Sequence, residues 1–159
     1  PEEKKFKDYS RGMKMKLAIA VALSHDAKLL LLDEATSGLD PVIRDEILDI
    51  FFEFTRDEEH SILLSSHIVS DLEKVCDYIA FLHKGRLLLC QEKELLLERF
   101  GLVHCSREQL LDLGSAVHGK KETPYGIEAL VERDAAPSGM QVSPIGVEDL
   151  FIYLTKEAD

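Results

Sequence analysis

The pattern of apolar and polar positions divides the first part of the chain into alternating helices and strands. Apolar residues within Met13–Ser24 recur at helical spacing, and Ser10 stands where it can cap that helix. Leu29–Leu32 is a continuous apolar run closed by Asp33. Such a run is typical of a buried strand in a sheet that is covered on both faces.

A second helix and a second strand follow the same pattern. Pro41 comes directly after Asp40, which is the order of a helix N-cap followed by a proline at the first helical position. Apolar residues then mark one helical face as far as Phe54, and Ser61–Ser66 predicts another buried strand that ends at His67. These segments predict a strand–helix–strand unit.

Shorter elements complete the first hundred residues. We predict a short helix over Val69–Cys76, two strands over Ile79–Leu82 and Arg86–Cys90, and a helix over Glu92–Phe100 that stops at Gly101. Since helices and strands alternate, we expect an α/β protein with a largely parallel sheet.

The composition of the chain changes after about residue 101, and the predicted elements become shorter. Glycines, prolines and polar residues between positions 114 and 146 break the chain into short pieces, while Ile127–Glu132 predicts a strand and Val147–Leu154 a closing helix. We therefore expect two parts, an α/β core over residues 1–101 and a small α+β subdomain over residues 102–159.

Composition and charge narrow the possible partners. The 159 residues are 45% hydrophobic and 31% charged, as in an ordinary globular protein, and the net charge of −11 disfavours a nucleic acid or an anionic membrane surface as the main partner. Residues 1–16 nevertheless carry six bases against three acids, which indicates an anionic ligand there. The three widely spaced cysteines suggest reduced thiols with a packing role.

The strongest chemical signal is the pair of carboxylates at Asp33 and Glu34, which ends an apolar strand. Ligand sites of α/β sheets lie at the carboxyl ends of the strands. One carboxylate there can hold Mg²⁺, directly or through water, and the other can orient or deprotonate an attacking water. Alternatively, Asp33 merely caps a turn and Glu34 is solvated.

Three segments, at their spacings, carry a resemblance to a known family. Tyr9–Leu17, Leu29–Pro41 and Ser61–His67 resemble the carboxy-terminal half of the nucleotide-binding domain of ABC-type ATPases. The resemblance implies that the fold is an incomplete P-loop ATPase core. It also implies that Asp33 is the Mg²⁺-associated Walker B aspartate, Glu34 the catalytic base and His67 the switch histidine that contacts the γ-phosphate.

The start of the first helix resembles the signature motif of the same family, usually Leu-Ser-Gly-Gly-Gln. Ser10 and Gly12 match it, whereas Tyr9, Arg11 and Met13 depart from it. A serine hydroxyl and backbone N–H groups at a helix start still form an anion site, and Arg11 adds a positive charge. By this resemblance, Ser10, Arg11 and Gly12 bind nucleotide.

The resemblance also implies partners. Asp40 resembles the D-loop aspartate, which couples two sites across a dimer, although it serves equally as a helix cap. Family domains pair head to tail, with ATP and Mg²⁺ between the P-loop of one and the signature of the other. A second nucleotide-binding domain and an integral membrane transporter subunit at the cytoplasmic face are thus expected. The tail, with Val147–Phe151, resembles those of bacterial exporter-type subunits.

A P-loop is the missing part of this pattern. The sequence contains no Gly-x-x-x-x-Gly-Lys-Ser/Thr; Gly114–Lys121 comes near it but ends in lysine, and Pro124 follows where a helix should be under way. We assign that segment to a loop. Phosphoryl transfer depends on a P-loop, so we expect a fragment of a longer ATPase that hydrolyses no ATP alone. Its incomplete sheet should favour self-association.

Two other functions remain open at this point. One is a soluble ABC-type ATPase acting in translation or DNA repair; the acidic balance and the lack of a basic, aromatic patch argue against it, so no nucleic acid partner is expected. The other is a non-catalytic module in which the tail after residue 101 regulates or dimerises the domain.

Overall fold

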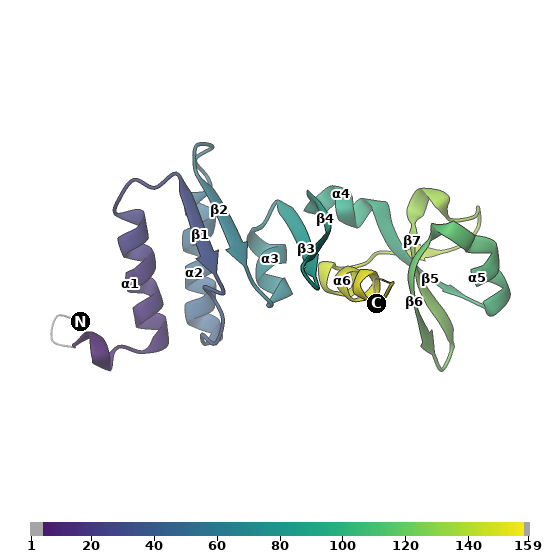
Figure 1. The fold of residues 1–159 in the computed structure, drawn as a ribbon, viewed down its shortest axis with the longest axis horizontal. Coiled ribbons are helices and arrows are strands. Elements are labelled where there is room, and N and C mark those ends of the chain that lie inside the picture. The colour runs from purple at the N-terminus through teal and green to yellow at the C-terminus, as the bar shows by residue number, and fades with distance from the viewer. Residues whose placement is uncertain (1–4, 158–159) are drawn as a thin grey trace. The chain divides into compact units, whose positions relative to one another are not determined.

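The computed structural model describes residues 5–157, which form two compact units that divide between Val75 and Cys76 (Figure 1). Unit 1 contains a 3₁₀ turn and five regular elements: Phe6–Asp8, α1 (Arg11–Leu23), β1 (Leu29–Asp33), α2 (Pro41–Phe54), β2 (Ser61–Ser65) and α3 (Val69–Val75). Unit 2 contains β3 (Tyr78–His83), β4 (Arg86–Glu92), α4 (Lys93–Arg99), β5 (Phe100–Cys105), α5 (Arg107–Leu113), β6 (Val117–Thr123), β7 (Gly126–Glu132), β8 (Val142–Ser143) and α6 (Val147–Glu157). The division of the chain at residue 101 stays a prediction. The compact units divide earlier, and β3, β4 and α4 fall in unit 2.

The first two helices of unit 1 begin where the sequence predicts, because each has a side-chain cap. The Ser10 hydroxyl accepts a hydrogen bond from the Met13 N–H at 3.2 Å, and the Asp40 carboxylate accepts one from the Ile43 N–H at 3.1 Å. Such caps satisfy backbone donors that the first helical turn leaves unpaired. The two caps also fix the positions of Ser10 and Asp40, two of the residues assigned to nucleotide.

The core of unit 1 lies on one face of its sheet. β1 and β2 pair in parallel, and the core is built around Ile19, Ile47 and Phe51, with Leu48 and Ala35 beside them. α1 turns Ile19 toward this core. Leu17 and Val21, which the apolar spacing predicts on the buried side of the helix, lie at the surface instead. In α2, by contrast, Ile47 and Phe51 lie on the side that the apolar spacing predicts, and both are buried.

The opposite face of the β1–β2 sheet is exposed, which corrects the prediction of strands buried on both faces. Leu29, Leu31 and Leu63 are 56%, 70% and 67% exposed. Residues of β1 therefore alternate between core and surface, as in a sheet covered on one face only.

Unit 2 is antiparallel throughout the pairs that the structure describes. β3 and β4 form a hairpin whose turn at Lys84 and Gly85 has positive φ at both residues, and a four-stranded sheet follows in the order β6-β7-β5-β8. Within residues 5–157, parallel pairing is thus confined to β1 and β2. The fold class, an α/β core with a small α+β part, is confirmed. The expected largely parallel sheet is reduced to the β1–β2 pair, because the other strand pairs of the described residues are antiparallel.

Two details of the carboxy-terminal part differ from the prediction. The helix predicted over Glu92–Phe100 ends at Arg99, and Gly101, where it was expected to stop, lies inside β5. The segment Gly114–Lys121 is not a loop either, since a short 3₁₀ turn at Gly114–Ala116 leads directly into β6. Both differences arise because strand pairing, which local composition does not reveal, orders glycine-containing segments.

Two further observations bear on chemistry and location. Over the described residues, no helix is both long and apolar enough to cross a membrane.

The three cysteines are free: Cys105 is buried, Cys76 is half-buried and Cys90 is exposed. The packing role predicted for all three therefore fails for Cys90. Burial raises the pKa of the Cys76 and Cys105 thiols, which makes them less reactive.

Candidate functional site

The two acidic residues of the candidate site lie where β1 ends. Asp33 is the last residue of the strand, and Glu34 adopts a left-handed conformation with φ +50. Successive side chains of a strand point to opposite faces, so a continued strand would separate the two carboxylates. The turn at Glu34 ends that alternation, so the two carboxylates can serve one site.

Ser65, the last residue of β2, holds both acids in place. It lies opposite Asp33 in the parallel pair, and its hydroxyl donates a hydrogen bond of 2.5 Å to the Asp33 carboxylate. The Glu34 N–H donates to the backbone carbonyl and the hydroxyl oxygen of Ser65, each at 3.1 Å. Sequence reasoning missed this role, since only the register of the two strands brings these residues together.

His67 completes the cluster from the loop after β2. Its Nδ1 lies 2.6 Å from the Glu34 carboxylate, and the two side chains are 68% and 40% exposed. The structure thus brings together the two residues assigned to catalysis, one from each strand end. Both side chains remain accessible to a ligand arriving from solvent.

Residues of the predicted signature lie against the segment that leads into α2. Gly12 is buried, and a Cβ added there would come 2.8 Å from the Ile43 side chain, closer than real Cβ contacts allow. At Gly38, which has φ +66, an added Cβ would clash with the Arg11 guanidinium. These contacts tie the start of α1 to the loop that carries Asp40.

The signature residues and the acidic cluster form two separate groups. Within residues 5–157, no hydrogen bond or ion pair links Ser10, Arg11 or Gly12 to Asp33, Glu34 or His67. Asp40 caps α2 and belongs with the first group. By their hydrogen bonds and ion pairs, the seven predicted residues thus fall into two groups.

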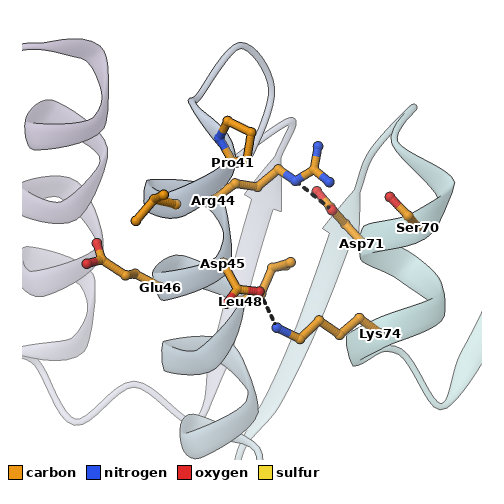
Figure 2. A pocket seen from close by; sticks show the side chains of 9 residues that line it. Pro41, Arg44, Asp45, Glu46, Leu48, Ser70, Asp71 and Lys74 are labelled. Carbon is orange, nitrogen blue, oxygen red and sulfur yellow. Dashed lines mark hydrogen bonds and ion pairs between the residues drawn. The ribbon is translucent and has the colours of Figure 1, made fainter.

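A different feature, a hollow of about 560 Å³ between α2 and α3, was not expected from the sequence (Figure 2). The Arg44 Nε lies 3.1 Å from the Asp71 carboxylate, which is 1% exposed, and Lys74 pairs with Asp45 at 2.6 Å. These ion pairs join α2 to α3. Arg44 and Lys74 are paired within the protein, although the second oxygen of the Asp71 carboxylate has no hydrogen-bond partner among the described residues. We therefore assign this hollow a structural role.

The acidic cluster fits Mg²⁺ that is shared with a ligand. Over the described residues, no group of three or more histidine, cysteine or acidic side chains could hold a metal on its own. Mg²⁺, however, usually takes one or two carboxylates and completes its shell with water and phosphate oxygens. Asp33, exposed and placed by Ser65, fits that requirement.

Comparison with known proteins finds homologues over much of the chain. Residues 5–70 match the family described as "AAA domain, putative AbiEii toxin, Type IV TA system". The chain is 36% identical over 169 residues to the uncharacterized ABC transporter ATP-binding protein YhcH of Bacillus subtilis (strain 168), in an alignment that covers 96% of this chain and 55% of that protein. The chain is a homologue of ABC transporter ATP-binding proteins. The resemblance drawn from the motifs is confirmed.

Other ABC relatives agree. The lantibiotic transport ATP-binding protein SrtF of Streptococcus pyogenes is 42% identical over 93 residues, 58% of this chain and 39% of that protein. A solved structure, "An inward-facing conformation of a putative metal-chelate type ABC transporter", matches with a TM-score of 0.55 at 21% identity, over 81% of this chain and 49% of that one, and shows the fold. The chain therefore spans about half the length of YhcH and less than half of SrtF.

Proposed function

We propose that the chain is part of an ATP-binding subunit of an ABC transporter, of bacterial exporter type, and that the whole protein hydrolyses ATP to drive transport. The observation that carries the proposal is the 2.6 Å contact between Glu34 and His67, beside Asp33, at adjoining strand ends. An exposed carboxylate hydrogen-bonded to an imidazole is suited to accept a proton from water.

Each residue of the acidic cluster has a separate task in this proposal. Glu34 orients the attacking water and takes its proton, and His67 fixes the Glu34 carboxylate and can contact the terminal phosphate. Asp33 would hold Mg²⁺, which supplies the positive charge that phosphoryl transfer needs. The Ser65 hydroxyl, bound to Asp33 at 2.5 Å, keeps that carboxylate turned toward the strand end.

The signature group serves a second copy of the domain. The positive end of α1 carries Ser10 and Gly12, with the charge of Arg11 beside them, and a helix start of this kind attracts phosphate. In a head-to-tail dimer, which the resemblance to the signature motif implies, this group would face the partner's nucleotide. Asp40, at the start of α2, then lies between the two sites.

The membrane partner follows from the same proposal. SrtF is named for lantibiotic transport, and we propose that this chain likewise works with an integral membrane subunit, at the cytoplasmic face. The carboxy-terminal segment supports the exporter type through its sequence resemblance alone.

The proposal is tested by ATP hydrolysis in the intact protein that carries this segment. Glu34→Gln removes the base but keeps the shape of the side chain, so we expect turnover to fall at least about 100-fold while MgATP binding remains. Glu58→Gln, an exposed glutamate outside both groups, serves as the control. Hydrolysis at the normal rate in Glu34→Gln would refute the assignment.

The 159-residue chain by itself is expected to hydrolyse no ATP above background, because its sequence contains no P-loop to hold the phosphates. A phosphate-release assay with Mg²⁺ checks this. Mg²⁺-dependent turnover by this chain that Glu34→Gln abolishes would contradict the expectation.

A further inference from the structure

We propose that unit 2 carries a second binding site, a hollow that takes a single-chain amphiphilic anion such as a medium-chain carboxylate. The hollow measures about 520 Å³ and is lined by Leu110, Leu111 and Val117 together with Lys120 and Lys156. Its volume lies in the range of small-molecule sites, which are mostly apolar with a few polar groups. It involves none of the residues assigned to ATP.

The apolar wall is formed where α5 turns into β6. α5 starts at a capping box of Ser106 and Gln109 and ends at Gly114, whose φ of +50 suits glycine. Leu110 and Val117 pack partly against the core of unit 2, whereas Leu111 is 80% exposed. A leucine this exposed at the edge of a hollow offers apolar surface to a ligand.

The cationic wall depends on the close approach of α6 to β6. A Cβ added to Gly119 would come 2.6 Å from the backbone oxygen of Tyr153, so only glycine permits this approach. Lys120 follows Gly119 in β6, and Lys156 lies three residues beyond Tyr153, on the same side of α6. The helix and the strand therefore each contribute one ammonium group to the hollow.

Charge is what distinguishes this hollow from others in residues 5–157. In the hollow beside α4, of about 320 Å³, Arg99 and His118 both bind Glu132, at 2.6 and 3.1 Å, and the Arg99 hydrogen bond lowers the pKa of Glu132. By contrast, Lys120 and Lys156 form no ion pair within the described residues, and no acidic side chain lines their hollow.

Two ammonium groups without an ion pair among the described residues, beside an apolar wall, favour a ligand with the complementary pattern, an anionic head and an apolar tail. A concave site of this volume suits one chain in solution better than a flat membrane surface. The proposal is independent of the ATPase function, since its test involves no nucleotide.

The test is a titration of the full 159-residue chain with decanoate, followed by backbone amide NMR. We expect shift changes to cluster over residues 110–120 and 153–156, and decyltrimethylammonium, with the same tail length and the opposite charge, to cause none there. Lys120→Met and Lys156→Met should each weaken decanoate binding about fivefold, the effect of losing roughly 1 kcal/mol of charge interaction.

Two further variants test the apolar contact with the ligand tail and the effect of removing a positive charge outside the hollow. Leu111→Gln, at an exposed position that tolerates a polar group, should weaken decanoate binding, and Lys121→Met, next to the hollow but outside its lining, should leave it unchanged. Shift changes centred on Leu29, Leu31 and Leu63 instead, equal binding of decanoate and decyltrimethylammonium, or binding only to anionic phosphatidylglycerol vesicles would each overturn the proposal.

Discussion

At the scale of single residues, the site depends on the unusual backbone conformation of Glu34, a non-glycine residue with positive φ. A non-glycine residue with positive φ costs of the order of 1 kcal/mol or more and persists only where its surroundings impose it. Here two hydrogen bonds from the Glu34 N–H to Ser65 and one between its carboxylate and His67 impose it. The conformation turns the carboxylate out of the strand, which is the geometry that the proposed base needs.

Tyr153 gives a prediction about pH at the same scale. Its hydroxyl donates to Glu128 at 3.1 Å, and burial together with that carboxylate raises the pKa of Tyr153 to about 12 from an ordinary value of 10. The folded chain then keeps a proton that the unfolded chain loses, so stability is full below pH 10 and falls as the pH rises toward 12.

Urea unfolding at a series of pH values checks this. We expect the free energy of unfolding to fall between pH 10 and 12 by about 1–3 kcal/mol more in the wild type than in Tyr153→Phe. Tyr125→Phe, at a fully exposed tyrosine, should leave the wild-type pH dependence intact. An identical pH profile in the wild type and Tyr153→Phe would disprove the effect.

The sequence predicts the roles of single residues that depend on neighbours a few positions away. Ser10 and Asp40 were identified as caps because a cap and the N–H it binds lie three residues apart, and Asp33 and Glu34 because they end an apolar run. Ser65 and Asp71 were missed because their partners lie 32 and 27 residues away, and only the folded chain sets those distances.

At the scale of elements, α6 approaches β6 closely at Gly119. Replacement by alanine would put a methyl group against the Tyr153 carbonyl, at a φ of +157. We predict that Gly119→Ala lowers the free energy of unfolding by about 2 kcal/mol or more, measured by urea denaturation, because backbone must move.

A matched substitution at a second glycine separates the clash of the added methyl group from the strain of the backbone conformation. Gly139 has φ +94 and open space around the position of a Cβ, so Gly139→Ala carries strain without a clash. It should cost less than Gly119→Ala. If the two variants are equally destabilised, the close approach of α6 does not explain the requirement for glycine.

The sequence predicts an element correctly where its local periodicity determines which side is buried. The prediction fails where contacts with distant segments determine burial or strand pairing. α2 buries Ile47 and Phe51 on the side that its spacing marks, since a single core touches this helix. The run in β1 predicted two covered faces, but apolar residues in sequence do not reveal how many layers pack on a strand. The sequence predicts a loop where β6 begins, because the pairing of β6 with β7 lies outside any local pattern.

At the scale of the whole molecule, the exposed face formed by Leu29, Leu31 and Leu63 should drive association of two copies. β1 and β2 also form a sheet of only two strands, so each has an edge without a partner within residues 5–157. Exposed apolar faces and open edges both favour pairing with another chain. We predict that the purified chain is a dimer or larger.

Light scattering after size-exclusion chromatography measures the mass directly. Leu31→Lys should shift the population toward monomer, whereas Leu111→Lys, at a similarly exposed leucine in unit 2, should not. A monodisperse wild-type monomer at high concentration would contradict this prediction.

The accessibility of the three thiols has a practical consequence. Cys90 is exposed on β4, whereas burial raises the pKa of Cys76 and Cys105 and slows their reaction with electrophiles. A maleimide fluorophore applied briefly near neutral pH should therefore attach mainly to one position of the natural sequence. The chain thus carries its own attachment point for a fluorescent reporter on the β3–β4 hairpin, and no engineered cysteine is required.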